Sequence, residues 1–570
     1  MSVARPARDA GAAAAAAAVR RLDTDRLVVL GLAAAAIAPL AVFVVVPLAA
    51  ILQLSFVTPD GVGLANYVRE FANPKFTRIV ANSFAVALTT TLITVVLAYA
   101  FAYALRRTAM PLKRTCGAIA LLPLYAPSLV QALGILFLFG RNGIVNRTFD
   151  LRLDIYGFWG IVVSDVFYSF PHAYLILSAA LAVGDARLYE SARMLGAGAG
   201  RMFRTITLPS TRYGIISAIF VVFTIVITDF GNPMVIGADY GVLATEIYNQ
   251  VSGQGRMELG AVIGVVLLVP AAVAVVVERM VARGHHAAIS DRSQPLAIAG
   301  SGRRERVALA YALLVCAGIA AVVVVVFVAS FVTLWPYSMH PSLRHYRFEV
   351  QNGIAPLWTS IVVSLLAAVI GVVATVTAAC VMRWLRPLGA QTLYFLSVLP
   401  AAVPGMVLGL GYILVFNHPA NPLGFLYGSL AILAICNVYH YHAQGFLVAT
   451  TSVGQVSRVF DETSACLGAG TLRTLRRVIL PLVAPALASI GVFFFVRSMV
   501  TLSAVIFLVT PSTQLAAVSV LLLDDAGNQN QAAAFSVCIM LIVAAVLGAF
   551  QLLARLAARR LQRPDPWKSG

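Results

Sequence analysis

Charged residues are scarce in this sequence. Asp, Glu, Lys and Arg make up 11% of the 570 residues and apolar residues make up 60%, against roughly 25% and 45–50% in an ordinary soluble domain. This composition excludes most soluble enzymes and favours a membrane protein. The net charge of +18 is compatible with three roles for the basic residues: they bind nucleic acid, they bind anionic lipid, or they lie in the cytoplasmic loops of a membrane protein.

Cysteine and histidine form no recognisable site. The six cysteines stand singly in or beside apolar runs, without a C-x-x-C pair, so the sequence predicts neither a disulfide framework nor a zinc site. His440 and His442 are two residues apart and would face different sides of a helix. We therefore expect no metal and no other cofactor.

Lysine is almost absent, and this bears on the energy supply. The three lysines are Lys75, Lys113 and Lys568, and none of them follows a glycine. An ATP-binding loop of the form G-x-x-x-x-G-K-[ST] needs a Gly-Lys pair, because its backbone amides and its lysine hold the phosphates. The sequence therefore predicts a protein that is not an enzyme and has no ATPase site. Energy for any work that the protein does would then come from another polypeptide or from an ion gradient.

Long apolar runs, in contrast, are abundant. A membrane-spanning helix needs about 20 apolar residues, and twelve segments qualify, of which the fifth is the shortest. They lie near 27–56, 82–105, 116–140, 158–182, 214–230, 258–278, 307–335, 357–382, 391–416, 424–449, 482–509 and 532–554. The sequence thus predicts an all-α integral membrane protein with about twelve transmembrane helices. The first segment is expected to be retained rather than removed as a signal peptide.

Basic residues alternate between the connecting segments. With the N-terminus inside, 31 of the 41 basic residues fall on the inner side, which is the side that collects Lys and Arg. We expect a multi-pass protein of the bacterial inner membrane with both termini cytoplasmic. The tails 1–26 and 557–570 and a linker, 281–306, would then be cytoplasmic. Because no single basic patch with interleaved aromatics exists, nucleic acid is not an expected partner.

The chain carries an internal repeat. Residues 189–209 and 461–481 share nine of 21 positions without a gap at an offset of 272, and 121–134 echoes 398–411 at an offset of 277. The second echo includes the pairs Pro123/Pro400, Pro127/Pro404 and Gly134/Gly411. An even number of spans separates the copies, so the halves are parallel repeats related by a pseudo-two-fold axis. The predicted halves are 27–280, with a core unit 82–280, and 307–556, with a core unit 359–556.

Each copy of the 21-residue repeat forms a polar loop between two spans. Glycines would divide the loop into two short helical pieces. In the second piece we expect an apolar face with a basic border, from Met202, Phe203 and Ile206 in one copy and from Leu472, Leu475 and Ile479 in the other. Such a face suits docking into a groove of another protein, or an interfacial position on anionic lipid. Two copies in equivalent loops favour a two-fold protein partner.

The loop pattern E-x-x-x-x-x-G, followed by a hydrophobic residue and then x-L-P, resembles the "EAA" signature of permease subunits in binding-protein-dependent ABC importers. The resemblance implies that these loops couple to two copies of a separate ATPase subunit, and that a periplasmic binding protein delivers substrate. The positions that match the signature are Glu190, Gly196, Leu208, Pro209, Glu462, Gly468, Leu480 and Pro481. The alanines that follow the glutamate are only partly kept.

The resemblance also indicates a cargo. Importers with both permease halves fused in one polypeptide include systems for ferric iron, thiamine and 2-aminoethylphosphonate. Segments 229–250, 500–511 and 522–527 resemble the 2-aminoethylphosphonate group most, so we expect this substrate, with iron(III) or thiamine as the alternative.

Ionisable residues within the spans are few. A rival class, the ion-coupled secondary transporter, would place such groups there to carry the coupling ion. Asp165 and Asp229 lie near span ends and are expected to be wetted from the outer face. For Arg497, two interpretations stay open: it faces the translocation path and attracts a phosphonate or another oxyanion, or it pairs with a carboxylate or helix carbonyls inside the bundle. Asp229 and Arg497 are the candidate path residues.

Overall fold

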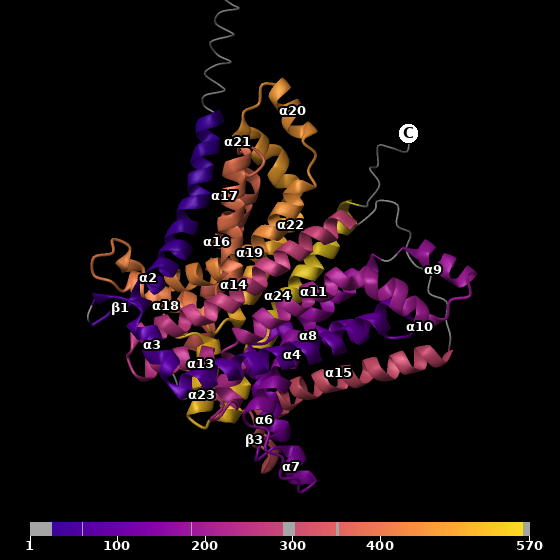
Figure 1. Ribbon diagram of the computed structural model, residues 1–570, viewed down its shortest axis with the longest axis vertical. Coiled ribbons are helices and arrows are strands. Elements are labelled where there is room, and N and C mark those ends of the chain that lie inside the picture. The colour runs from indigo at the N-terminus through magenta and orange to yellow at the C-terminus, as the bar shows by residue number, and fades with distance from the viewer. Residues whose placement is uncertain (1–24, 60, 184, 289–301, 349–352, 562–570) are drawn as a thin grey trace, which may run out of the picture.

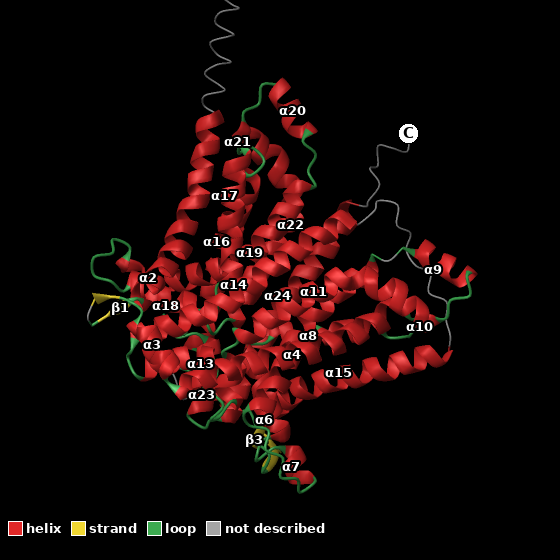
Figure 2. Ribbon diagram, in the orientation of Figure 1, coloured by secondary structure: helices red, strands yellow, loops and turns green. Residues whose placement is uncertain are grey.

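A computed structural model describes residues 25–59, 61–183, 185–288, 302–348 and 353–561 (Figure 1). The predicted tails and linker fall largely outside these ranges, at 1–24, 289–301 and 562–570. In the described residues, strands are confined to two small hairpins (Figure 2). One pairs β1 (Val57–Thr58) with β2 (Gly61–Val62), and the other pairs β3 (Val332–Leu334) with β4 (Ser338–Pro341). All other elements are helices, so the predicted all-α class is confirmed.

Ten helices of the described chain are long and apolar enough to cross a membrane. They are Asp25–Ser55, Pro74–Arg107, Ser128–Thr148, Phe158–Ala182, Ala199–Ile227, Met257–Val281, Gly302–Phe331, Ala355–Val381, Thr471–Val500 and Gln529–Leu556. The pieces Pro387–Ala402 and Gly405–Phe416, which meet at a bend of 108°, add an eleventh if they are one span. The predicted span 424–449 is also a helix, α19 (Leu430–Gly454). It is less apolar than the others because Asn437, His440, His442 and Gln444 lie along it.

The first half contains thirteen described helices besides the N-terminal part of its first span. They are α2 (Val46–Ser55), α3 (Ala65–Ala72), α4 (Pro74–Arg107), α5 (Lys113–Ala120), α6 (Ser128–Phe139), α7 (Ile144–Thr148), α8 (Phe158–Ala182), α9 (Ala186–Met194), α10 (Ala199–Met202), α11 (Leu208–Ile227), α12 (Gly231–Ile236), α13 (Leu243–Tyr248) and α14 (Met257–Ala288). The second half contains α15 (Gly302–Phe331), α16 (Ala355–Val381), α17 (Pro387–Val398), α18 (Gly405–Phe416), α19, α20 (Val459–Cys466), α21 (Thr471–Thr474), α22 (Leu480–Val500), α23 (Ala516–Asp525) and α24 (Gln529–Leu561).

The helices follow the repeat in the sequence. α8 and α19 begin and end 272 residues apart, as do α10 and α21. α6 and α18 begin and end 277 residues apart. The change of offset falls in the connection after α6, which is longer than the one after α18. In each half the first core helix packs on the next two long helices, α4 on α8 and α11, and α16 on α19 and α22.

The two halves interlock through their first helices. α2 packs against α18 of the second half, and α15 packs against α6 of the first half. A Cβ added at Gly134 of α6 would lie 2.6 Å from the carbonyl oxygen of Val322, and one at Gly411 of α18 would lie 2.9 Å from that of Pro47. The repeated glycine is therefore required because the first helix of the other half crosses there.

The repeated prolines break the third and ninth predicted spans. Pro127 and Pro404 immediately precede α6 and α18, and short 3₁₀ turns at η2 (Leu122–Tyr125) and η6 (Leu399–Ala402) lead into them. Each predicted span thus consists of two helices rather than one. A proline lacks the N–H that would continue the helix hydrogen bonds, and the residue before it disfavours the helical conformation.

Candidate functional site

The two loops that carry the sequence repeat have the same backbone. Each begins with a short helix, α9 or α20, that ends at a glycine in the left-handed conformation, Gly196 (φ 72°) or Gly468 (φ 68°). The next amide donates to a carbonyl five residues earlier, Ala197 to Ala192 and Ala469 to Ser464, both at 2.9 Å. This Schellman motif favours glycine, because the left-handed conformation costs other residues about 1 kcal/mol.

The other residues of the signature lie where the sequence predicts a loop and the return into the membrane. Glu190 and Glu462 are exposed on α9 and α20. The Leu-Pro pairs begin α11 and α22, directly after the π-turns Phe203–Thr207 and Leu475–Ile479. Figure 1 shows α9 and α20 on two separate projections, away from the side that carries β1, α7 and β3.

Of the six apolar residues expected on the docking face, Leu472 is 55% exposed and the other five are half-buried or buried. Phe203 packs edge-on against the rings of Tyr99 and Tyr103, at centroid distances of 6.2 and 5.6 Å, and Ile479 is fully buried. The second helical piece continues into α11 or α22 through a π-turn, so its apolar face packs on the bundle.

Apart from Leu472, the most exposed apolar residues of the loops lie in and just after the first helical piece. Met194 is 89% exposed and Leu195 is 85% exposed, and Leu467, the equivalent of Leu195, is 81% exposed. Leu188 and its equivalent Phe460 are exposed as well. Exposed apolar groups that recur at equivalent positions indicate a docking surface around α9 and α20.

An arginine anchors each loop to the core helix of its half, by different chemistry. In the first half, Arg107 at the end of α4 stacks on the ring of Tyr189, 5.0 Å from its centroid. In the second half, Arg383 forms an ion pair with Asp461, the equivalent of Tyr189, and donates to the carbonyls of Val453 and Val456 at 2.9 and 2.8 Å. The loop position that is anchored is repeated, but the arginines are not equivalent, since Arg383 corresponds to Arg106 at the offset of 277.

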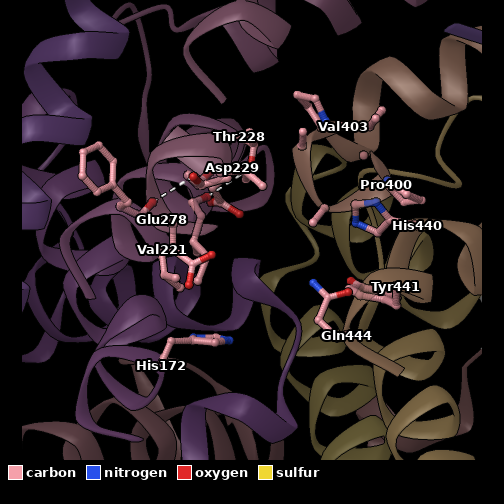
Figure 3. A pocket seen from close by; sticks show the side chains of 18 of the residues that line it. His172, Val221, Thr228, Asp229, Glu278, Pro400, Val403, His440, Tyr441 and Gln444 are labelled. Carbon is pink, nitrogen blue, oxygen red and sulfur yellow. Dashed lines mark hydrogen bonds between the residues drawn. The ribbon is translucent and has the colours of Figure 1, made fainter. Parts of the chain in front are cut away.

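A cavity of about 430 Å³ lies between the halves. Figure 3 shows its two walls: His172, Val221, Thr228, Asp229 and Glu278 come from the first half, and Pro400, Val403, His440, Tyr441 and Gln444 come from the second. Equivalent positions face each other, since His172 corresponds to Gln444 and Tyr168 to His440 at the offset of 272. The cavity therefore lies on the pseudo-two-fold axis.

Arg497 lines this cavity together with Asp229. Its Nη2 donates to Nε2 of His172, across the boundary between the halves, at 2.9 Å. Its guanidinium lies 5.6 Å from the ring centroid of Tyr441 and 6.0 Å from that of Phe493. In the part of the chain that the structure describes, no carboxylate lies within ion-pair distance of Arg497. Among these residues, the structure therefore does not support the interpretation that Arg497 pairs with a carboxylate.

Asp165 and Asp229 are buried rather than wetted as expected, because α12 covers them. Asn232 of α12 donates its side-chain amide to Asp165 at 2.7 Å and its backbone amide to Asp229 at 2.9 Å. Asp165 is fully buried and Asp229 is almost so. Asp165 does not line the cavity, whereas Asp229 reaches its wall.

The charges around the cavity are divided between the halves. The first half supplies the carboxylates Asp229 and Glu278 and also Arg279, and the second half supplies Arg497. Glu278 accepts a hydrogen bond from Ser217 at 3.0 Å and lies 3.5 Å from Arg279. Sequence reasoning missed His172 and Glu278. His172 could have been found from its place opposite Gln444 in the repeat.

The chain resembles known membrane proteins over most of its length. Residues 110–285 match the family described as "Binding-protein-dependent transport system inner membrane component". The chain is 28% identical over 529 residues to the "Ferric transport system permease protein FbpB" of Actinobacillus pleuropneumoniae, covering 89% of this chain and 75% of that protein. It is 29% identical over 496 residues to the "Putative ferric transport system permease protein FbpB 1" of Haemophilus influenzae, covering 83% and 76%.

A shorter relative is more similar. The "Putative ferric transport system permease-like protein AfuB" of Escherichia coli is 37% identical over 100 residues, which cover 18% of this chain and 83% of that protein. The family match includes the first repeated loop and the first-half wall of the cavity. This chain therefore belongs to the binding-protein-dependent transport system inner membrane components, as a fused double permease subunit of an ABC importer of the inner membrane.

Proposed function

We propose that this permease imports iron(III), handed over by a binding protein on one side of the membrane and driven by two separate ATPase subunits on the other. The observation that carries the cargo is the similarity, over 89% and 83% of the chain, to two proteins named as ferric transport permeases. In this proposal the repeated loops and both termini lie in the cytoplasm, as the distribution of basic residues predicts.

2-Aminoethylphosphonate, the cargo expected from the sequence, is the second candidate. The central cavity favours it, because Arg497 lies on one wall and the carboxylates of Asp229 and Glu278 lie on the other. A guanidinium attracts a phosphonate group and a carboxylate attracts an ammonium group. The cavity thus has the charge arrangement that a small zwitterion requires.

The proposed mechanism is a change of conformation rather than a chemical reaction of the chain. Each ATPase subunit binds the exposed apolar residues of one loop, beside Glu190 or Glu462. ATP binding draws the two subunits, and with them α9 and α20, toward each other. The interlocked halves then close around the cavity on the loop side and open on the opposite side. Tyr248 and Phe507, stacked at 6.2 Å across the halves, would separate in that step.

Reconstitution into proteoliposomes tests the cargo. The chain, together with a candidate ATPase and a candidate binding protein, would be supplied with ATP and either radioactive iron(III) or labelled 2-aminoethylphosphonate. ATP-dependent uptake of iron supports the first proposal, and uptake of the phosphonate alone replaces it by the second. Uphill transport by the chain without ATPase, driven by an ion gradient, would establish the secondary-transporter class instead.

The loop and cavity residues can be tested in the same system. Glu190→Ala combined with Glu462→Ala is expected to leave membrane insertion intact, weaken ATPase binding and abolish uptake. Arg497→Ala is expected to reduce uptake of an anionic or zwitterionic cargo by about tenfold or more, since it removes one charge-assisted hydrogen bond, whereas Arg497→Lys should retain part of it. Unchanged uptake by Arg497→Ala at normal expression would remove Arg497 from the path.

A further inference from the structure

An apolar groove of about 580 Å³ lies on the outer surface of the first half. It runs between α4, α15 and the start of α11, all of which belong to membrane-crossing helices. Val96, Ala100, Leu208 and Val307 line it and are exposed in the isolated chain. The groove therefore opens toward the bilayer, where apolar groups rather than water must fill it.

Four aromatic rings also line the groove, those of Tyr99, Tyr103, Phe203 and Tyr311. Tyr99 and Tyr103 of α4 both contact Phe203 edge-on. Phe203 belongs to the π-turn that connects the first loop to α11. Whatever lies in the groove thus contacts the segment that carries the loop.

One end of the groove is basic. Arg304 of α15 is exposed, and its guanidinium lies 5.4 Å from the ring centroid of Tyr103. Its Nη2 donates to the Tyr103 hydroxyl at 2.6 Å and to the Arg107 carbonyl at 3.1 Å. Arg303 and Arg306 flank it on α15.

These guanidinium groups lack counter-charges. Among the described residues, neither Arg304 nor Arg107 has a carboxylate within 4.0 Å. Arg107 is 6% exposed, and its Nε and Nη2 have no hydrogen-bond partner in that part of the chain. Of the two, only Arg304 lines the groove, so it is the cation that an anionic group in the groove would meet.

Among the described residues, the corresponding positions of the second half do not carry the same side chains. At the positions 277 residues away, Tyr99 is matched by Val376, Tyr103 by Cys380 and Arg304 by Leu27. Asp25 instead accepts a hydrogen bond from the amide of Thr471, at 3.0 Å, where the first helix meets the second loop. The site is therefore single in the part of the chain that the structure describes.

We infer that this groove binds one phospholipid with an anionic headgroup. An acyl chain lies against Tyr99, Tyr103 and Phe203, and the headgroup phosphate lies on Arg304. Basic pockets between membrane helices recognise anionic headgroups in this way, and arginine binds phosphate through two parallel N–H groups. By filling the space beside Phe203, the lipid supports the first loop and leaves the second loop unaffected.

Native mass spectrometry of the full chain tests this inference. Phosphatidylglycerol would be titrated against phosphatidylcholine with the same acyl chains. We expect one tightly held phosphatidylglycerol per chain and weaker retention of phosphatidylcholine. Arg304→Gln should weaken phosphatidylglycerol binding about fivefold, the loss of one basic contact, and should remove the preference between the two lipids.

Further variants separate charge from shape. Arg304→Lys should keep most of the preference, because a lysine also binds phosphate. Ala100→Phe, which fills the groove from an exposed position, should abolish tight binding of both lipids. Arg303→Gln is the matched control, since Arg303 does not line the groove, and should have little effect. Equal binding of the two lipids by the wild type, unchanged binding in Arg304→Gln, or two equivalent sites per chain would overturn the inference.

A functional readout follows in proteoliposomes with the ATPase. Phosphatidylglycerol should increase uptake by the wild type more than by Ala100→Phe. Hydrogen exchange should show slower exchange of α9 with the lipid and no change in α20. Equal protection of both loops would mean that a general surface effect, rather than the groove, is responsible. Failure of uptake with every cargo, but with lipid binding intact, would count against the proposed function and leave the lipid site standing.

Discussion

The two loop anchors should differ in strength, and this difference can be measured. Arg383→Ala removes the ion pair to Asp461 and the donors to the carbonyls of Val453 and Val456. Arg107→Ala removes only a contact with the ring of Tyr189. We expect the second loop to loosen far more than the first when its arginine is truncated.

The structure sets the magnitudes. The Arg383 side chain is 9% exposed and that of Asp461 is 22% exposed. Removing one partner of a buried ion pair costs about 3–5 kcal/mol, and the partial exposure of Asp461 lowers this to roughly 2–4 kcal/mol. A stacked arginine contributes about 1–2 kcal/mol, and truncating Arg107 also removes two unpartnered N–H groups, which offsets part of that loss. The difference of about 2 kcal/mol corresponds to a factor of about 30 in local opening.

Hydrogen exchange on the purified full chain measures this opening. Arg383→Ala should speed exchange in α20 about 30-fold relative to the effect of Arg107→Ala in α9. A double-mutant cycle with Asp461→Ala should give a coupling energy above about 1 kcal/mol. Equal acceleration in the two loops, or additive effects of Arg383→Ala and Asp461→Ala, would refute the argument that the ion pair holds the second loop.

Two further predictions concern stability. Gly411→Ala should lower the melting temperature by an amount equivalent to about 1–3 kcal/mol, because the added Cβ would lie 2.9 Å from the Pro47 carbonyl oxygen. Gly548→Ala is the control and should not lower it, since its Cβ would have no atom within 4 Å. Equal melting temperatures of the two variants would refute the interlocked packing. Burial raises the pKa of Asp524, which lies outside the spans, to about 6, above the value near 4 of an unfolded chain. Ionisation of Asp524 therefore destabilises the folded state as the pH rises from about 4 to about 6. Asp524→Asn removes this cost, so it should raise the melting temperature more at about pH 7.5 than at about pH 4.5. An effect that does not depend on pH would contradict this.

Much of the fold could be predicted because the chain repeats itself. The offset of 272 found in 21 loop residues extends through helices of unrelated sequence, such as α8 and α19. The repeated glycines and prolines also predict local structure, since left-handed turns and helix breaks depend on single residue types. Gly196 and Gly468 show this directly.

Packing partners could not be predicted in the same way. The apolar face expected at Phe203 exists, but periodicity shows only that a face is apolar and not what covers it. Here Tyr99 and Tyr103 cover it, and they lie about a hundred residues earlier. Likewise, the burial of Asp165 depends on Asn232, a residue beyond the next span. Such contacts depend on tertiary structure and leave no local signal in the sequence.

The two halves keep the same packing while their residues differ. Ser128 of α6 contacts Gly231 in the first half, whereas the equivalent contact in the second half joins Gly405 to Ser503, so the serine and the glycine have changed places. In each half the glycine has no room for a Cβ beside the serine. A serine at both positions would therefore clash, and a glycine at both would leave a gap.

The same compensation occurs at the centre of the helix packing. Phe494 of α22 packs against Gly371 and Gly445. The equivalent positions of the first half are occupied by Val222, Thr94 and Ala173. The second half thus has one large residue and two glycines where the first half has three smaller residues. The total side-chain volume is similar, as a close-packed interior requires. The halves therefore diverged under the constraint of a shared backbone, and that constraint left the two walls of the cavity free to differ in charge, with both carboxylates on one wall and Arg497 on the other.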